Sequence, residues 1–406
     1  MKKESKGLSS RYCKLSAIET RYKEFRKRRG SEHPEVYIFE KRLESNLKKI
    51  SEDLRTGSFQ FQSLRAVAIP KPNGKKRLIC KLTTRDNVVQ RLLAHFLMHD
   101  ANGKLKDRLG LLKSTISYGV LRDRGTMLAV NEAVKLRNKY SWVVKTDISA
   151  FFDNIDRQQL VAKLRKELSG ESLLPLIEQA VHLEIVESSA YIKNAINECK
   201  IKRGIGLRQG MPLSPILSSL YLRDFDQKLM ANEYEIVRYA DDIVGFCKSK
   251  EEAAELLAFI DSEVKKLKLS IPLVDSSINP SKTQIVNPEA EVIFLGIAIY
   301  KNEKGVYDKF VPKTRLPEVV KELDQFKDFN YLVKQGINVV DFNNKLKNIL
   351  RGYENAYKGC KNRQCFISDL SNAIRKIRAS VLETIFTQEI MSKLNDDKKR
   401  FFGLIE

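Results

Sequence analysis

The sequence predicts an α+β fold in which helices surround a small central sheet. Four short apolar runs typical of buried strands stand in the middle and later part of the chain: 142–144, 236–239, 243–246 and 292–296. Helical spacing of apolar residues dominates elsewhere, and after about residue 310 the pattern is helical and basic to the end. With 406 residues, 42% of them hydrophobic, the chain is long enough for two to four structural units.

The first elements are predicted from periodicity and turn residues. Apolar residues recur at helical spacing from Val36 to Leu54, which predicts one amphipathic helix. Strand-like residues 66–69 and 77–79 then flank the turn residues Pro72-Asn73-Gly74, as in a β-hairpin. Residues 84–98 are predicted to be a helix, because their apolar residues fall on one side.

The central elements follow in the same way. A buried strand begins at Trp142, and residues 157–200 are predicted to be mainly helical. A helix follows Pro215, two short strands follow at 236–239 and 243–246, and residues 251–269 form an amphipathic helix. The run 292–296 is predicted to be another buried strand.

The charge balance points to a polyanionic partner. The chain has 73 Lys and Arg against 51 Asp and Glu, a formal net charge of +22. Such an excess favours nucleic acid, because neutralising phosphates releases condensed counterions; an anionic membrane surface is the second candidate. No apolar stretch reaches the length of a membrane span, and no signal core follows Met1, so we expect a cytoplasmic protein without membrane contact. Six scattered cysteines form no C-x-x-C pair, which argues against a zinc site.

Three acidic residues stand at the ends of apolar strands. Asp241 and Asp242 lie at the tip of the predicted hairpin, and Asp147 ends the strand that begins at Trp142. Adjacent carboxylates repel each other, and a divalent cation bound between them and a third carboxylate removes that cost. Oxygen ligands suit Mg²⁺, and two ions about 3.5–4 Å apart clamp the attacking and leaving oxygens of a phosphoryl transfer. Because most Asp-Asp pairs are solvated loop acids, the prediction depends on further features.

Two of these features concern the shape of a nucleotide site. Phe152 follows Asp147 by five residues, where a large ring can lie under the sugar of an incoming nucleotide and exclude a 2′-hydroxyl. The segment 206–215 contains glycines that allow close backbone approach to a ligand, and its Gln209 can contact the nucleotide or the template. The alternatives are a core aromatic for Phe152 and a plain turn before a helix for the segment.

Two further features are cations. From the hairpin at 66–79, Lys71 and Arg77 can reach over the site and neutralise a triphosphate. Lys282, beyond the helix at 251–269, can assist the pyrophosphate leaving group. Taken alone, a basic hairpin is more often merely solvated, and a solvated side chain explains Lys282 equally well. All four features nevertheless occur in the order that such a site requires.

Together these residues resemble the bacterial reverse transcriptases over roughly residues 60–305, and more loosely beyond. Tyr239-Ala240-Asp241-Asp242 matches the family's Y-x-D-D box, and the segment 206–215 matches its G-x-x-Q-G-x-x-x-S-P pattern. The resemblance implies an RNA-directed DNA polymerase, a nucleotidyltransferase that uses two Mg²⁺ ions. It implies catalysis by Asp147, Asp241 and Asp242, and metal binding by these three with Ile148. It implies substrate binding by Lys71, Arg77, Phe152, Gln209, Tyr239 and Lys282, and a primer grip at Phe294, Leu295 and Gly296.

The implied fold is a right-hand polymerase with an RRM-like palm, fingers and a helical thumb. The parts expected are a basic N-terminal arm and helix (1–60), fingers (61–140), a palm (141–305, with a helical fingers insertion at about 157–200) and a helical thumb (306–406). The implied partners are an RNA template, a DNA product and dNTPs. The sequence leaves the oligomeric state and the primer open.

Departures from subfamily patterns narrow the resemblance. Retron enzymes carry N-A-x-x-H and V-T-G, whereas residues 194–198 lack the histidine and no V-T-G occurs. Diversity-generating enzymes replace the Q-G-x-x-x-S-P segment, which is intact here. Group II intron enzymes show G-L-P-Q-G, whereas Arg208 stands in the proline position. What remains resembles the compact, free-standing reverse transcriptases of bacterial antiphage defence that act with a non-coding RNA.

Other functions remain open at this point. One alternative is a group II intron-type reverse transcriptase or maturase, and another is an RNA-binding scaffold with a vestigial polymerase fold. Phe152 argues against RNA-templated RNA synthesis, and the three costly acids argue against a pure scaffold. Basic residues recur at both ends of the chain, at 26–29 and over 345–378, which favours a larger structured RNA as the partner that supplies the template.

Overall fold

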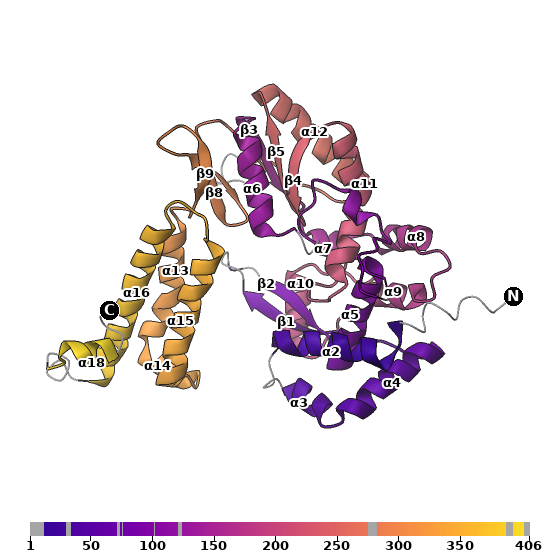
Figure 1. The fold of residues 1–406 in the computed structure, drawn as a ribbon, viewed down its shortest axis with the longest axis horizontal. Helices are drawn as coiled ribbons and strands as arrows, with labels where there is room; N and C mark the ends of the chain where they lie inside the picture. The colour runs from indigo at the N-terminus through magenta and orange to yellow at the C-terminus, as the bar shows by residue number, and fades with distance from the viewer. Residues whose placement is uncertain are drawn as a thin grey trace. The chain divides into compact units, whose positions relative to one another are not determined.

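The computed structural model describes residues 12–29, 34–70, 74, 76–100, 102–120, 124–274, 282–386 and 393–401 (Figure 1). The chain divides into two compact units. Unit 1 comprises Met1–Ala129 and Val144–Ile285, and unit 2 comprises Val130–Val143 and Val286–Glu406. Both contain helices and antiparallel strands in separate runs, so the α+β expectation is confirmed.

Unit 1 begins with three helices, α2 (Leu15–Arg29), α3 (Pro34–Glu40) and α4 (Leu43–Thr56). The prediction of a single helix from Val36 to Leu54 is therefore wrong, because the helix is interrupted between α3 and α4. The end of α3 is held to α2, since the Tyr22 hydroxyl donates to Glu40 at 2.6 Å and Arg26 pairs with the same carboxylate at 2.5 Å. The amphipathic spacing continues through this bend and conceals it.

The predicted hairpin is confirmed. Strands β1 (Arg65–Pro70) and β2 (Lys76–Lys81) pair antiparallel, with Ile69 opposite Arg77. Helix α5 (Thr84–Met98) follows, and the side chain of Thr83 caps it by accepting from the Asp86 amide. Helix α10 (Ala190–Glu198) packs on the hairpin through apolar contacts with Ala66 and Leu78.

The central sheet has four strands in the order β4-β5-β3-β6, and Figure 1 labels β4, β5 and β3. They are β4 (Glu235–Tyr239), β5 (Asp242–Cys247), β3 (Trp142–Asp147) and β6 (Gln284–Val286). Helices α11 (Ser214–Ala231) and α12 (Lys250–Lys266) confirm two further predictions. Helix α12 lies directly on β5, because a Cβ at Gly245 would stand 2.4 Å from the Leu256 side chain.

The predicted helical stretch between the strands is also confirmed. It contains α8 (Arg157–Glu167), α9 (Leu174–Val181) and α10, preceded by the short α7 (Phe151–Asn154). The 3₁₀ turn η1 (Leu111–Lys113) and helix α6 (Thr126–Arg137) precede β3.

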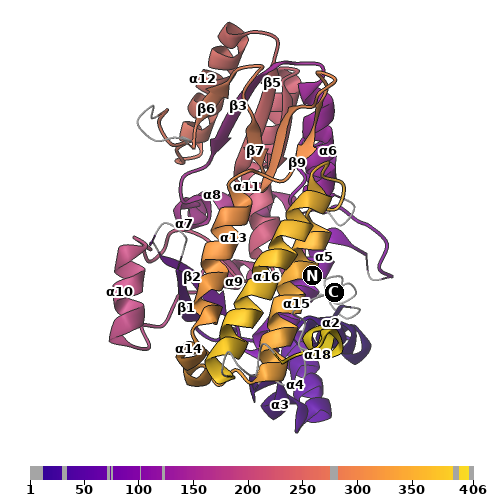
Figure 2. The same cartoon turned by 90° about the vertical axis from the view of Figure 1, so that its left-hand side faces the viewer.

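Unit 2 combines a three-stranded sheet with a helical bundle. The strands are β7 (Val292–Phe294), β8 (Ile297–Lys301) and β9 (Tyr307–Phe310). The helices are α13 (Arg315–Leu323), η2 (Asp324–Lys327), α14 (Phe329–Lys334), α15 (Val339–Ala356), α16 (Arg363–Ile385) and α18 (Asp396–Phe401). Figure 2 shows α13, α15 and α16 side by side, with α16 in contact with the other two.

The strand predicted over 292–296 is shorter than expected. It ends at Phe294, which pairs with Ile297 of β8. Leu295 and Gly296, with φ of 51° and 78°, form the two-residue turn between the strands. Positive φ at both central positions matches the twist of a two-residue hairpin turn, so the apolar run contains a turn that its hydrophobicity does not reveal.

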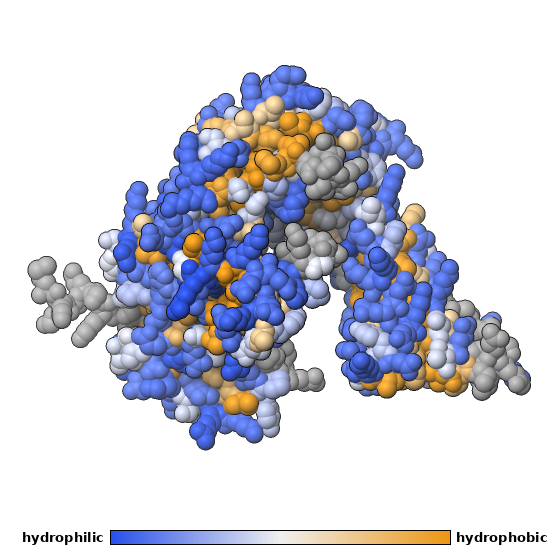
Figure 3. Space-filling view, turned by 180° about the vertical axis from the view of Figure 1, so that it is seen from behind, coloured by the Kyte–Doolittle hydropathy of each residue, from blue (hydrophilic) through white to orange (hydrophobic). Residues whose placement is uncertain are grey.

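Hydrophilic side chains cover much of the surface on the face shown in Figure 3. Within the described ranges, no helix is both long enough and apolar enough to cross a membrane.

Candidate active site

A cleft of about 800 Å³ in unit 1 gathers most of the predicted site residues. Its lining includes Arg77 of β2, Asp147 and Ile148 at the end of β3, Phe152 of α7, Gln209, Asp241 and Lys282. Ligand pockets in proteins typically measure about 300–1,000 Å³. The cleft therefore has room for a nucleotide-sized ligand, with carboxylates, cations and an aromatic ring around it.

The β4–β5 hairpin places one of the paired acids in the cleft. Tyr239 lies opposite Asp242, which leaves Ala240 and Asp241 as a two-residue turn with Ala240 at φ 54°. The Ile148 amide donates to the Asp241 carbonyl at 3.1 Å and joins the turn to the end of β3. Asp241 lines the cleft, whereas Asp242 and Tyr239 are not among its lining residues.

Burial and neighbouring carboxylates raise the pKa values of Asp241 and Asp242. Burial, followed by the charge of Asp147, raises the pKa of Asp241, while Lys282 and Arg77 oppose the change. Burial raises the pKa of Asp242 to about 6; Lys145 lowers it, and Asp241 and Asp147 raise it. Three carboxylates in mutual electrostatic range are costly unless a cation neutralises them.

The donor chemistry fits a hard divalent cation. One oxygen of Asp147, Oδ1, is buried without a hydrogen-bond partner, which leaves it available to a ligand. In the described part of the chain, no three His, Cys, Asp or Glu side chains converge as a ready ligand set. Carboxylate oxygens such as those of Asp147 and Asp241 are the ligands that Mg²⁺ prefers. In the described structure these side chains do not converge closely enough to form a complete metal site.

Lys282 binds the other carboxylate oxygen of Asp147. Its ammonium forms an ion pair with Asp147 Oδ2, and the lysine side chain is 68% exposed. The next residue fixes the segment, because the hydroxyls of Thr283 and Thr146 lie 2.8 Å apart and Thr283 donates to the Pro272 carbonyl at 2.6 Å. Lys282 is thus an exposed cation that is ion-paired with the acid that ends β3.

Phe152 and Gln209 are joined through the main chain. The Leu207 amide donates to the Phe152 carbonyl at 2.7 Å, and the Cys80 amide donates to the Gln209 carbonyl at 2.7 Å. At Gly206, with φ 81°, a Cβ would lie 2.5 Å from the Asp153 carbonyl oxygen, so glycine is required there. The segment 206–209 is therefore a close-packed loop between α7 and β2, which goes beyond the alternative of a plain turn before a helix.

The structure also adds residues that the sequence did not single out. Lys76, Glu198, Cys199, Lys200 and Ile201 all line the cleft. The end of α10 is held against the hairpin, because Lys76 pairs with Glu198 at 3.1 Å and Cys199 donates to the Lys76 carbonyl at 3.3 Å. No motif marks these positions, since only the packing of α10 on β1–β2 brings them to the cleft.

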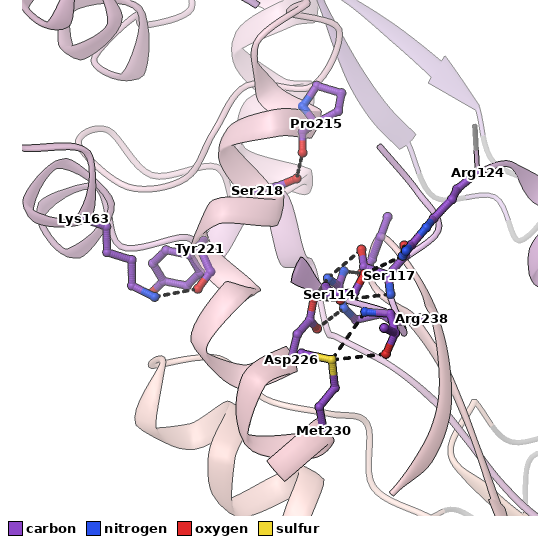
Figure 4. Close-up of polar contacts among 12 residues, drawn as sticks. Ser114, Ser117, Arg124, Lys163, Pro215, Ser218, Tyr221, Asp226, Met230 and Arg238 are labelled. Carbon is purple, nitrogen blue, oxygen red and sulfur yellow. Dashed lines mark hydrogen bonds and ion pairs between the residues drawn. The ribbon is translucent and has the colours of Figure 1, made fainter. Parts of the chain in front are cut away.

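A buried ion pair between Arg238 and Asp226 lies close to the acidic turn, and Figure 4 shows this pair with Ser114 and Ser117 beside it. Arg238, 1% exposed, donates from Nε to Asp226 at 2.6 Å, and Asp226 is 2% exposed. Arg238 Nη1 also donates to the Ala240 carbonyl at 2.8 Å, and Nη2 donates to the Ser117 hydroxyl at 3.0 Å. The guanidinium therefore fixes the carbonyl that precedes Asp241. Sequence reasoning treated Arg238 only as part of a strand.

Lys71 and the three primer-grip residues complete the predicted set. Lys71 falls outside the described residues. Phe294, Leu295 and Gly296 belong to unit 2, where they form the end of β7 and the β7–β8 turn. Their primer-grip role stays a prediction.

Comparison with known proteins places this geometry in a family. Residues 69–299, more than half of the chain, match the family described as reverse transcriptase (RNA-dependent DNA polymerase). Among the relatives, Protein YkfC of Escherichia coli (strain K12) is 27% identical over 198 residues, 47% of each chain. The group II intron-encoded protein LtrA of Lactococcus lactis subsp. cremoris is 26% identical over 185 residues, which cover 45% of this chain and 28% of that protein.

A solved structure, the partial Cas6-RT-Cas1–Cas2 complex, aligns with a TM-score of 0.36 and 25% identity, over 63% of this chain and 41% of that one. The chain spans between 20% and 47% of the length of the curated relatives it matches. The family match covers both the Phe152 loop and the Asp241 turn. The chain belongs to the reverse transcriptase family.

Proposed function

We propose that this protein is an RNA-directed DNA polymerase, which adds dNTPs to a primer by phosphoryl transfer on an RNA template. The observation that carries the proposal is that Asp147, Asp241, Phe152 and Gln209 line one cleft. A pure binding scaffold has no need for a buried carboxylate, Asp241, whose pKa is raised by burial and by the neighbouring Asp147. The family match supports the same reaction class.

In this proposal the acids hold two Mg²⁺ ions. Asp147, Asp241 and Asp242 supply carboxylate oxygens and Ile148 contributes beside them; the bound ions neutralise charge on the reacting phosphate. Arg77 and Lys282 neutralise the triphosphate and the leaving pyrophosphate. Lys71 has the same role as Arg77, and Tyr239, beside the acidic turn, also binds the substrate. Gln209 contacts the nucleotide or its template, and Phe294, Leu295 and Gly296 hold the primer end.

One primer-extension assay separates this function from its alternatives. The purified protein is given a primed RNA template with Mg²⁺ and either dNTPs or rNTPs. Extension with dNTPs is expected. Extension with rNTPs alone would indicate RNA-templated RNA synthesis, and RNA binding without extension would indicate a scaffold.

The sugar specificity gives a second expected result. Phe152→Ala opens the space beneath the sugar and should raise the incorporation of rNTPs relative to dNTPs. A pocket that adds or removes bulk discriminates by about 1–3 kcal/mol, so the ratio of kcat/KM values should change by ~10-fold to a few hundred-fold. Single-nucleotide extension kinetics measure this ratio.

Phe259→Ala is the matched control, because Phe259 is a half-buried ring on α12 that packs on Tyr234 and does not line the cleft. The control should leave the ratio unchanged. If Phe152→Ala also leaves it unchanged, Phe152 is a packing residue and not a sugar gate.

The finer proposal concerns the template: a structured non-coding RNA partner, acting in bacterial antiphage defence. It is supported by the resemblance and by cations beyond the cleft. Exposed cations without an ion pair in the described structure lie on and beside α15 and α16: Lys347, Arg351, Lys358 and Lys376. The helical part of unit 2 presents a largely hydrophilic surface in Figure 3. Distributed cations suit a folded RNA that contacts more than a primer–template duplex.

The expected result is that the purified protein carries one RNA species after a high-salt wash. Non-specific phosphate contacts fade steeply as salt rises, so only a specific complex survives, and sequencing identifies it. An RNA encoded beside the protein's own gene supports the proposal, and phage infection with and without that gene tests the defence role. A group II intron RNA would favour the intron-type alternative, in line with the similarity to LtrA. A random cellular mixture would contradict both.

A further inference from the structure

A buried ionic cluster lies behind the loop that carries Gln209. Two arginines, Arg157 and Arg208, share the single carboxylate of Glu184, at 2.6 Å each and on different oxygens. Both arginine side chains are 2% exposed, whereas Glu184 is 26% exposed. With two guanidinium groups to one carboxylate, the cluster holds an excess positive charge in the interior.

This cluster is a costly way to stabilise a fold. Taking charges out of water carries a desolvation penalty that a single shared carboxylate repays only in part. Burial lowers the pKa of Arg157, as expected for a cation removed from solvent. In addition, Nε and Nη1 of Arg208 have no hydrogen-bond partner within the described residues. Well-packed apolar side chains would stabilise the interior at least as well, so the arrangement calls for another explanation.

The cluster fixes the main chain of one loop at three points. The bonds are Arg157 Nε to the Gly206 carbonyl (2.8 Å), Arg208 Nη2 to the Lys202 carbonyl (2.9 Å) and the Gly204 amide to Glu184 Oε1 (2.8 Å). The backbone of Glu184 is itself anchored, because its carbonyl accepts from the Leu64 amide at the start of the hairpin at 2.9 Å. The loop 202–208 is thereby held to both the helical insertion and the hairpin.

Both nucleotide-facing side chains depend on this loop. Gln209 follows Arg208 directly, and the Ser214 hydroxyl donates to the Arg208 carbonyl at 2.8 Å. Phe152 is held by the Leu207 amide. A shift of the loop would therefore move Gln209 and Phe152 relative to each other. The width of the nucleotide site would change with their separation.

We propose that Arg208, held by Glu184, is a positioning residue for nucleotide selection, which fixes the separation of Gln209 and Phe152. The inference rests on the proposed polymerase function. The proposed role also explains why an arginine can stand at position 208, where group II intron enzymes carry a proline. A proline stiffens such a loop through its fixed φ, whereas here an ion pair across 24 residues of sequence holds it.

The variant Arg208→Gln tests the positioning role. It leaves no unpaired charge in the interior, because Arg157 and Glu184 remain as a one-to-one ion pair. The first readout is hydrogen exchange of the amides of Gly204, Gly206, Leu207 and Cys80, which needs no turnover. Loss of the Glu184 and Lys202 contacts should speed their exchange by ~10-fold or more. The second readout is kinetic: KM for dNTPs should rise by ~10-fold and the rNTP/dNTP ratio should change, while kcat changes by less than about threefold.

Two matched variants separate positioning from general damage. Arg165→Gln removes an exposed arginine of α8 that pairs with Glu178 at 2.8 Å, and it should change neither readout. Arg208→Lys should recover part of the wild-type behaviour, because both Arg208 bonds come from the one nitrogen Nη2 and a shorter, more strongly hydrated ammonium can replace them only in part.

The outcomes are distinguishable. Unchanged exchange in Arg208→Gln overturns the proposal, whatever the protein polymerises. Faster exchange with unchanged KM and unchanged sugar ratio overturns the link to nucleotide selection. A wild type that incorporates no nucleotide refutes the proposed function, and the exchange result still decides whether Arg208 holds the loop.

Discussion

Replacing Asp241 and Asp242 together with Ala is expected to abolish dNTP incorporation. The double variant removes the carboxylates of the β4–β5 turn and leaves only Asp147 of the three acids. Metal ions that clamp the reacting oxygens contribute several kcal/mol to the transition state, and each 1.36 kcal/mol is tenfold in rate. The loss should therefore exceed about a thousandfold, as measured by single-turnover primer extension.

RNA binding should persist in this variant, since the basic surface is unchanged. The matched control is Asp396→Ala with Asp397→Ala, an adjacent acidic pair on α18 in unit 2 that is exposed. It should extend primers at the wild-type rate. Wild-type incorporation by the Asp241/Asp242 variant would refute the assignment of the cleft as a metal-dependent active site.

The parts of the site that the sequence predicted share one property. Asp147, Phe152, Gln209 and Asp241 each stand at a fixed offset from a short apolar run or a glycine, so local spacing was sufficient to find them. Secondary structure was predicted for the same reason, where periodicity was uninterrupted. Periodicity does not predict the α3–α4 break or the Leu295-Gly296 turn, because hydrophobic spacing continues through both.

The residues that were missed depend on contacts between distant parts of the chain. Arg238 bonds to a serine 121 residues away, and Lys76 pairs with a glutamate 122 residues away. A single arginine in a strand or a loop carries no signal that distinguishes a buried, paired side chain from a solvated one. Only the tertiary structure shows that Arg238 supports the acidic turn and that Glu184 joins two arginines.

Replacing Arg238 with Met is expected to cost about 3–5 kcal/mol of unfolding free energy, because it leaves the carboxylate of Asp226 buried without its partner. Chemical denaturation measures the loss. The exposed Arg165–Glu178 pair supplies the control, since Arg165→Met should cost at most about 1 kcal/mol. Equal stability of Arg238→Met and the wild type would contradict the buried-pair interpretation.

A second substitution separates stability from function. In the double variant Arg238→Met/Asp226→Leu no charge is left uncompensated, so much of the lost stability should return. The bonds to the Ala240 carbonyl and the Ser117 hydroxyl stay absent, and the turn that carries Asp241 loses its fixed position. We therefore expect recovered stability with a primer-extension rate that remains at least about tenfold below the wild type, since displaced catalytic groups lose rate steeply. Recovery of both would show that the pair serves only the fold, whereas recovery of stability alone assigns Arg238 to the geometry of the active site.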